Sequence, residues 1–296
     1  MDPPLRRYLA GLLAAARDVL GAELVGAYAA GSVGLGAYEP GRSDVDVALV
    51  CADALDLARR QELVARLRHE ALPCPARGLE LVVYRCEVAR SGTPEPGFEV
   101  ELNTGARMPF RATWAAADRP AGDGLFWYGL DRSILHQCGH ALLGPPAAAT
   151  FADLSPADLR RLLTEALCWW LALPTPPGDD PAPGAEDAVL GACRALVKVR
   201  HGGWLSKVDA GRRLIADGWP AEPIAADPVS PGRSAGDPIA AGRAATDRTS
   251  GPHVDGWPGG LIERSIAARA GGTPPGGLEA RAFQRRVLTE IRAGAA

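Results

Sequence analysis

The spacing of hydrophobic and polar positions changes about 120 residues into the chain. Before that point, short apolar runs bounded by Gly, Pro and Asp predict strands, and two longer amphipathic segments predict helices. The clearest strand alternates Phe98 and Val100 with Glu99 and Glu101, which is typical of a half-buried strand. The predicted elements are helices over 4–20 and 54–72 and strands over 24–29, 45–51, 79–88 and 97–103.

Beyond that point the apolar spacing is that of helices. The best-marked helix has Ser155 as its N-cap and Pro156 at its first helical position, and Asp158 completes a capping box. Residues 221–260 are rich in Pro, Gly, Ala and Asp without any period, which predicts a long loop or disorder. The predicted helices are 131–144, 154–173, 188–202, 206–218 and 277–294, with a loop over 174–187.

This succession of elements predicts an α+β protein of two domains. We expect an N-terminal α/β domain over residues 1–148 and an all-helical C-terminal domain over residues 149–296. The second domain would contain the long Pro/Gly-rich loop at 221–260.

Composition places the chain among ordinary globular proteins. Hydrophobic residues make up 47% and charged residues 23%, and no apolar run approaches the roughly 18 residues of a membrane helix. The N-terminal segment has an early acid and recurring arginines, unlike a signal peptide. The six cysteines are scattered without a CxxC pair, so we expect reduced thiols and neither a disulfide framework nor a zinc site. We therefore expect a cytoplasmic protein that does not bind membranes, and a monomer.

The net charge narrows the choice of partners. A formal charge of −3 argues against broad nucleic-acid binding, which needs basic surfaces to neutralise phosphates. It is compatible with a small cationic substrate.

The chemistry begins with two acids, Asp44 and Asp46, at the start of the strand predicted over 45–51. Residues two apart in a strand share a face, so the two carboxylates converge. Keeping both ionised in a partly buried site is costly without a cation. Magnesium removes that cost, and it prefers carboxylate and phosphate oxygens as ligands. The turn at Gly31 and Ser32 offers backbone N–H groups and a hydroxyl to such a phosphate.

A third acid, Glu80, is the best candidate to complete this chemistry. It stands between Leu79 and Leu81 in a predicted strand that is otherwise apolar for several residues. A lone acid in such a strand is costly unless it is used or paired.

The order of these residues resembles the nucleotidyltransferase superfamily that includes DNA polymerase β. Its motif is a Gly-Ser pair, a spacer of roughly ten residues, and Asp-x-Asp on a strand. Here the motif reads Gly31-Ser32, then Ser43-Asp44-Val45-Asp46. The alternative interpretation of this stretch is a plain β-turn in which Ser43 and Asp44 make local caps.

The chain more specifically resembles the bacterial aminoglycoside adenylyltransferases of the streptomycin/spectinomycin class. The resemblance covers most of the chain outside 221–260, and it lies in the stretches GAYAAGSVGLGAYEPGRSDVDVALV, GLELVVYRCEV, ALLGPP and EDAVLGACRALVKVRHGGWLSKVDAGRRL. It implies a polymerase β-like nucleotidyltransferase α/β domain followed by a helical bundle, with the active site between them. It also implies that ATP is a co-substrate, that Mg²⁺ is the cofactor and that AMP is transferred to a hydroxyl of a cationic aminoglycoside or aminocyclitol.

The resemblance assigns roles residue by residue. Asp44 and Asp46 would hold Mg²⁺, and Glu80 would be the catalytic base. The residues expected to bind the nucleotide are Gly31, Ser32, Ser43, Asp131, Arg194 and Lys207.

The acceptor side is less determined by the sequence. In the family, an aromatic residue and acids of the helical domain hold the antibiotic. The acids available here are Asp179, Asp180, Glu186 and Asp187, and the loop that carries most of them is longer and rich in proline. We take Asp180, Glu186, Asp187 and Trp170 as the candidate acceptor-binding residues. Trp169 and Trp170 are neighbours on a predicted helix, so their rings should point about 100° apart and at most one should face the cleft.

Two other functions remain open at this point. The same chemistry could act on a protein or a tRNA, although the weak net charge disfavours tRNA. The chain could also be a non-catalytic, nucleotide-binding relic of the fold. The presence of all three acids, Asp44, Asp46 and Glu80, argues against this interpretation.

Overall fold

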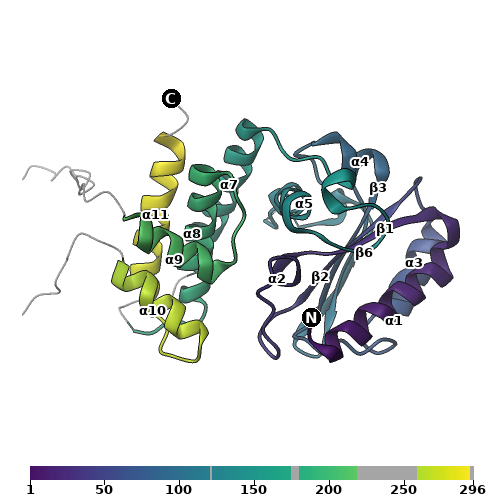
Figure 1. The fold of residues 1–296 in the computed structure, drawn as a ribbon, viewed down its shortest axis with the longest axis horizontal. Coiled ribbons are helices and arrows are strands. Elements are labelled where there is room, and N and C mark those ends of the chain that lie inside the picture. Colours follow the sequence, from purple (N-terminus) through teal and green to yellow (C-terminus); the bar gives the residue numbers. More distant parts are fainter. Residues whose placement is uncertain (121, 175–179, 219–258, 294–296) are drawn as a thin grey trace, which may run out of the picture.

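The computed structural model describes residues 1–120, 122–174, 180–218 and 259–293. Figure 1 shows a mixed sheet with helices on both of its sides, and a separate group of helices formed by the rest of the chain. This is the predicted α+β class, with a helical C-terminal part following an α/β part. The domain boundary near residue 148 stays a prediction.

The sheet has six strands in the order β5-β4-β3-β2-β1-β6. Strands β2 and β3 are parallel, and every other neighbouring pair in this sheet is antiparallel. The strands are β1 (Leu24–Ala29), β2 (Val45–Cys51), β3 (Leu79–Arg85), β4 (Phe98–Gly105), β5 (Met108–Thr113) and β6 (His140–Leu143).

The two faces of the sheet are covered differently. On β2, Val45, Val47 and Leu49 point toward α1 (Pro3–Leu20) and α3 (Leu57–Leu67) and join one apolar core. The intervening Ala48 and Val50 belong to a second, smaller core on the opposite face.

The second core is built by helices and loops that follow the strands. It includes Tyr84 of β3, Tyr128 of α5 (Phe126–Cys138) and Phe151, next to α4 (Cys86–Ser91) and α6 (Ala147–Thr150). The ring of Phe151 packs edge-on against Tyr28 of β1 and Tyr84. Asp46 shares a face with Ala48 and Val50 but lies at the start of β2, so it is at the edge of the second core.

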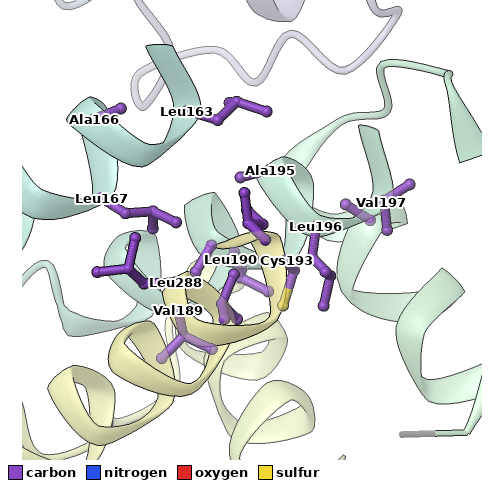
Figure 2. Packing of buried hydrophobic residues seen from close by; sticks show 14 of the residues in the cluster. Leu163, Ala166, Leu167, Val189, Leu190, Cys193, Ala195, Leu196, Val197 and Leu288 are labelled. Carbon is purple, nitrogen blue, oxygen red and sulfur yellow. The ribbon is translucent and has the colours of Figure 1, made fainter. Parts of the chain in front are cut away.

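The helical part packs around α8 (Ala185–His201). Figure 2 shows apolar side chains of α8, among them Val189, Cys193 and Leu196, in one cluster with Leu167 and Leu288 of neighbouring helices. Their spacing of three or four residues makes one continuous buried face. The surrounding helices are α7 (Pro156–Ala172), α9 (Lys207–Asp217), α10 (Gly259–Arg269) and α11 (Gly277–Ala293).

The helix starts follow the capping rules. Ser155 Oγ accepts the amide of Asp158 at 3.1 Å, as the predicted capping box requires. Ser206 Oγ accepts the amide of Asp209 at 3.1 Å and so places Lys207 at the first position of α9.

Four predicted elements were wrong in extent or kind. Residues 131–144 are not one helix, because α5 ends at Cys138 and the next residues pair with β1 as β6. The strand predicted over 79–88 ends at Arg85 and continues as α4. The predicted loop over 174–187 is shorter, because α8 already begins at Ala185. The predicted helix over 54–72 is shorter and spans only α3, because Asp56 caps it.

Several elements were not predicted at all, among them the short helix α6. Strand β5 was missed, and so was helix α10, which takes in the last two residues of the predicted loop 221–260. The greater part of that loop, 221–258, lies outside the described residues. Within the residues that the structure describes, no helix is long and apolar enough to cross a bilayer.

Arg132 of α5 generates a prediction about stability. Its side chain is 2% exposed and donates to the carbonyl oxygens of Thr93, Glu95 and Pro96 at 2.8, 2.5 and 2.8 Å. Arg132→Met removes the donor from all three oxygens, of which that of Pro96 is buried, so the free energy of unfolding should fall by about 3 kcal/mol. Urea unfolding measures this change.

The matched control is Arg161→Met, which removes an exposed arginine whose ion pairs within the described part of the chain are with Asp158 and Glu165 on its own helix. That variant should lose no more than about 0.5 kcal/mol. Equal losses in the two variants would show that the Arg132 hydrogen bonds do not stabilise the fold.

Candidate active site

A cavity of about 830 Å³ lies between the sheet and the helical part. Its floor is the open end of the second sheet face, and α8 and α9 form the opposite wall. It is lined by residues of both parts, including Asp46 and Glu80 from the sheet and Arg194 and Lys207 from the helices. The predicted catalytic and nucleotide-binding residues therefore meet in one place.

Four carboxylates converge on the floor of this cavity: Asp44, Asp46, Glu80 and Asp131. Asp44 and Asp46 lie at the start of β2, on one face. The parallel register of β2 and β3 sets Asp46 directly beside Glu80. Asp131 approaches from α5.

The crowding changes the acidity of these groups. Loss of hydration, reinforced by the charges of Asp44 and Asp131, raises the pKa of Glu80 to about 7. Burial raises the pKa of Asp131 to about 6, although the Arg194 guanidinium opposes the shift. The pKa of Asp46 is raised well above its usual value, first by burial and then by the other three carboxylates. The cluster therefore favours binding of positive charge.

Arg77 supplies part of that charge. Its Nη2 lies 2.7 Å from Asp44 Oδ2 and 3.9 Å from Glu80 Oε1. Glu80 still opens into the cavity, where 42% of its side chain is accessible. It remains available to a reacting group.

The Gly-Ser pair forms the one-turn helix α2 (Gly31–Gly34), where the sequence predicted a turn. Gly31 has φ +50°, and a Cβ built on it would lie 1.8 Å from Asp46 Oδ2. Only glycine fits there, because the backbone passes directly against the carboxylate. Ser32 Oγ is buried and has no hydrogen-bond partner among the described residues, as expected of a hydroxyl that serves a ligand.

Ser43 lines the cavity but has a visible structural task. Its Oγ accepts the amide of Glu39 at 3.0 Å, and its carbonyl oxygen accepts the amide of Arg77 at 3.1 Å. It thus holds the loop between α2 and β2 and the segment before β3 in place around Asp44.

The opposite wall carries cations. Arg194 of α8 lies over the ring of Trp204 at 5.2 Å, and it faces Asp131 and Asp46, whose charges support its ionised form. Burial nevertheless lowers the pKa of Arg194. Lys207 Nζ lies 3.2 Å from Asp187 Oδ1.

The proposed acceptor-binding residues divide into two groups. Trp170 and Asp187 line the cavity. Asp180 is exposed and does not line the cavity. Glu186 is buried, and its carboxylate pairs with Arg42 Nη2 at 3.1 Å and accepts the Gly184 amide at 3.0 Å. The assignment of these two acids to the acceptor is corrected on this geometry.

Both tryptophans of α7 line the cavity, together with Trp127 of α5. The prediction that only one would face it was wrong. The rings of Trp169 and Trp170 pack edge to face with centroids 5.2 Å apart, and Trp127 lies 6.1 Å from Trp169. Trp169 Nε1 donates to the Gly122 carbonyl at 2.7 Å. The result is an aromatic wall at one end of the cavity.

Sequence reasoning missed several residues of the site. Arg42, Arg77, Trp127 and Arg269 all line the cavity. A single arginine on a loop or a helix end carries no periodic or motif signal.

The donor set suits a magnesium ion bound together with a phosphate. Within the described residues, no group of three or more His, Cys, Asp or Glu side chains forms a ready-made metal cage. Magnesium does not require one, since it is commonly held by one or two carboxylates plus substrate phosphates. Asp44 and Asp46 are such a pair, and the orphan Ser32 hydroxyl lies on the same short segment as the glycine that touches Asp46.

No family model and no curated protein matches the sequence. Among solved structures, the fold matches that of the spectinomycin adenyltransferase AAD(9) from Enterococcus faecialis, determined with ATP and spectinomycin. The TM-score is 0.59 at 12% identity, and the match covers 97% of this chain and 99% of that one. The fold implied by the sequence resemblance is thereby confirmed.

Gly31 generates a prediction about the carboxylate floor. Gly31→Ala forces a Cβ into the Asp46 carboxylate, so the carboxylate must leave its present position. We expect the folded variant to lose binding of Mn²⁺, used as a probe for the divalent site and measured by calorimetry.

Gly36→Ala is the control for the backbone strain alone. Gly36 also has positive φ, +67°, but a Cβ there meets nothing within 4 Å. This variant should lose about 1 kcal/mol of stability and keep its Mn²⁺ binding. Equal binding in both variants would contradict the contact between Gly31 and Asp46.

The raised acidities generate a prediction about pH. A carboxyl group whose folded pKa exceeds its unfolded value stabilises the fold below the unfolded pKa, and this contribution is lost as pH rises through the folded pKa. For Glu80 the window runs from 4.5 to about 7. In a chelating buffer, the thermal midpoint should fall as pH rises through this window, and Glu80→Gln should flatten the fall. A midpoint that rises through the window in both proteins would contradict the shifts.

Proposed function

We propose that this protein is a nucleotidyltransferase that transfers AMP from ATP to a hydroxyl of an aminocyclitol or aminoglycoside. The observation that carries the proposal is one cavity in which the carboxylates Asp44, Asp46 and Glu80 face Arg194 and Lys207. It is supported by the fold, which is shared with an adenyltransferase determined with ATP and spectinomycin.

The carboxylate floor would organise the reaction. Asp44 and Asp46 would hold Mg²⁺, which when bound neutralises phosphate charge and stabilises the attacking and leaving oxygens. Arg77 keeps Asp44 in position through their 2.7 Å contact. The Ser32 hydroxyl and nearby backbone amides would donate to a phosphate of ATP.

The helical wall would hold the triphosphate in line. Arg194 and Lys207 would bind phosphate oxygens from the side opposite the carboxylates. The acceptor hydroxyl would attack the α-phosphorus, and the bond to the pyrophosphate leaving group would break.

Glu80 would take the proton of the attacking hydroxyl. It opens into the cavity beside Asp46, and its pKa of about 7 suits proton transfer near neutral pH. Trp127, Trp169 and Trp170 would provide an apolar surface for the acceptor ring.

The dimensions of the site favour a small acceptor over a protein or a tRNA. A cavity of about 830 Å³ is within the usual range for small-molecule sites and is walled by both parts of the chain. The intact carboxylate set favours an enzyme over a relic.

Glu80→Gln tests the proposal. Pyrophosphate release from ATP and Mg²⁺ should depend on one member of a panel of aminoglycosides and spectinomycin, and it should fall at least about 100-fold in the variant. The Kd for ATP should change by no more than about threefold, because the neutral isostere keeps the shape of the side chain.

Glu70→Gln is the control, since Glu70 is an exposed acid paired with Arg68 outside the cavity. It should retain full turnover. Turnover near the wild-type rate in Glu80→Gln would rule out Glu80 as the base, and no acceptor-dependent release by the wild-type protein would rule out the proposed reaction.

A further inference from the structure

The helical wall contains a carboxylate clamped between two cations. Asp187, in the first turn of α8, contacts Arg269 Nη1 at the end of α10 and lies 3.2 Å from Lys207 Nζ at the start of α9. All three side chains line the cavity. Three helices therefore bring one anion and two cations to the same point.

The surroundings leave this point with an excess of positive charge. Arg42 reaches across from the loop before β2 and donates to Glu186 Oε1 at 3.1 Å and to the Arg269 carbonyl at 2.9 Å. Glu186 is thereby neutralised, and among the described residues Asp187 is the acid that pairs with Lys207 and Arg269. Burial and the positive charges of Arg194 and Arg269 lower the pKa of Lys207, and Asp187 opposes this shift. The effect of the two arginines reflects the same excess of positive charge.

The Arg269 guanidinium has a hydrogen-bond donor that is not in use. Its side chain is 15% exposed, and Nε is buried without a hydrogen-bond partner among the described residues. A guanidinium can bind two oxygens of a carboxylate or a phosphate at once. Here only one of its nitrogens contacts Asp187.

An ammonium group of an acceptor is a poor partner for Asp187. It would have to approach a carboxylate that already touches two cations, and it would add a third positive charge beside them. A phosphate oxygen has the opposite preference, because it can replace the carboxylate between Lys207 and Arg269.

We propose that Arg269 is a further triphosphate-binding residue and that Asp187 is the anion that occupies Lys207 and Arg269 until a phosphate oxygen takes its place. The inference rests on the nucleotidyl transfer proposed above. It changes the role of Asp187 from acceptor binding to competition with the nucleotide for the same two cations.

The two substitutions have opposite expected effects on ATP binding. Arg269→Gln removes a charge-assisted contact, so the Kd for MgATP should rise about tenfold. Asp187→Asn removes the competing charge, so the Kd should fall about threefold or more. Isothermal calorimetry with MgATP measures both, and the KM for the acceptor should stay within about twofold in Asp187→Asn.

Control residues lie outside the cavity on α10 and α9. Arg264→Gln removes an exposed arginine of α10 that pairs with Glu279, and Asp217→Asn removes an acid of α9 that pairs with Arg213 and His201. Both should leave the Kd for MgATP unchanged. Arg269→Lys keeps the positive charge but loses the two parallel donors of the guanidinium, so it should weaken MgATP binding less than Arg269→Gln.

Four results would overturn the inference. MgATP binding that is unchanged in Arg269→Gln would remove Arg269 from the triphosphate site. Weaker MgATP binding in Asp187→Asn would contradict its competition with phosphate, and a raised acceptor KM with unchanged MgATP binding would return it to the acceptor. A wild-type protein that binds no MgATP overturns the proposed function as well, so the two failures are distinguishable.

Discussion

The candidate site depends on balancing the repulsion among four carboxylates, three at the end of one sheet face and one on the helix α5 beside it. Parallel pairing of β2 and β3 sets Asp46 beside Glu80, and Asp44 and Asp131 complete the group. Such a cluster is unfavourable in an apolar interior. It persists because the second core stops short of it, and because Arg77 and Arg194 supply positive charge from two sides.

The helical part places positively charged side chains opposite these carboxylates. Helices α8, α9 and α10 each place a cation on the cavity, and the apolar face of α8 fixes their relative positions through its packing. Arg42 links the sheet part to this wall through Glu186 and the Arg269 carbonyl. The resulting charge separation across one cavity is what a metal–polyphosphate ligand requires, since its cation and its anion bind to opposite walls.

The sequence predicted the elements with strong local signals and failed where partners lie far along the chain. The motif around Asp44 and the N-cap at Ser155 are local, and the structure has both features. Strand β6 was missed because His140–Leu143 reads as a helix continuation, and only pairing with β1 makes it a strand. The neutralisation of Glu186 by Arg42 is a contact between residues 144 positions apart, and no spacing rule reveals it.

The central claim is that this cavity joins a nucleotide to a small acceptor, and identification of the product by mass spectrometry tests it most directly. The protein is incubated with ATP, Mg²⁺ and spectinomycin or each aminoglycoside in turn. The account predicts an acceptor that carries one adenylyl group, with pyrophosphate formed in equal amount. Bound ATP with no adenylylated acceptor, or ATP hydrolysed to AMP without transfer, would contradict it.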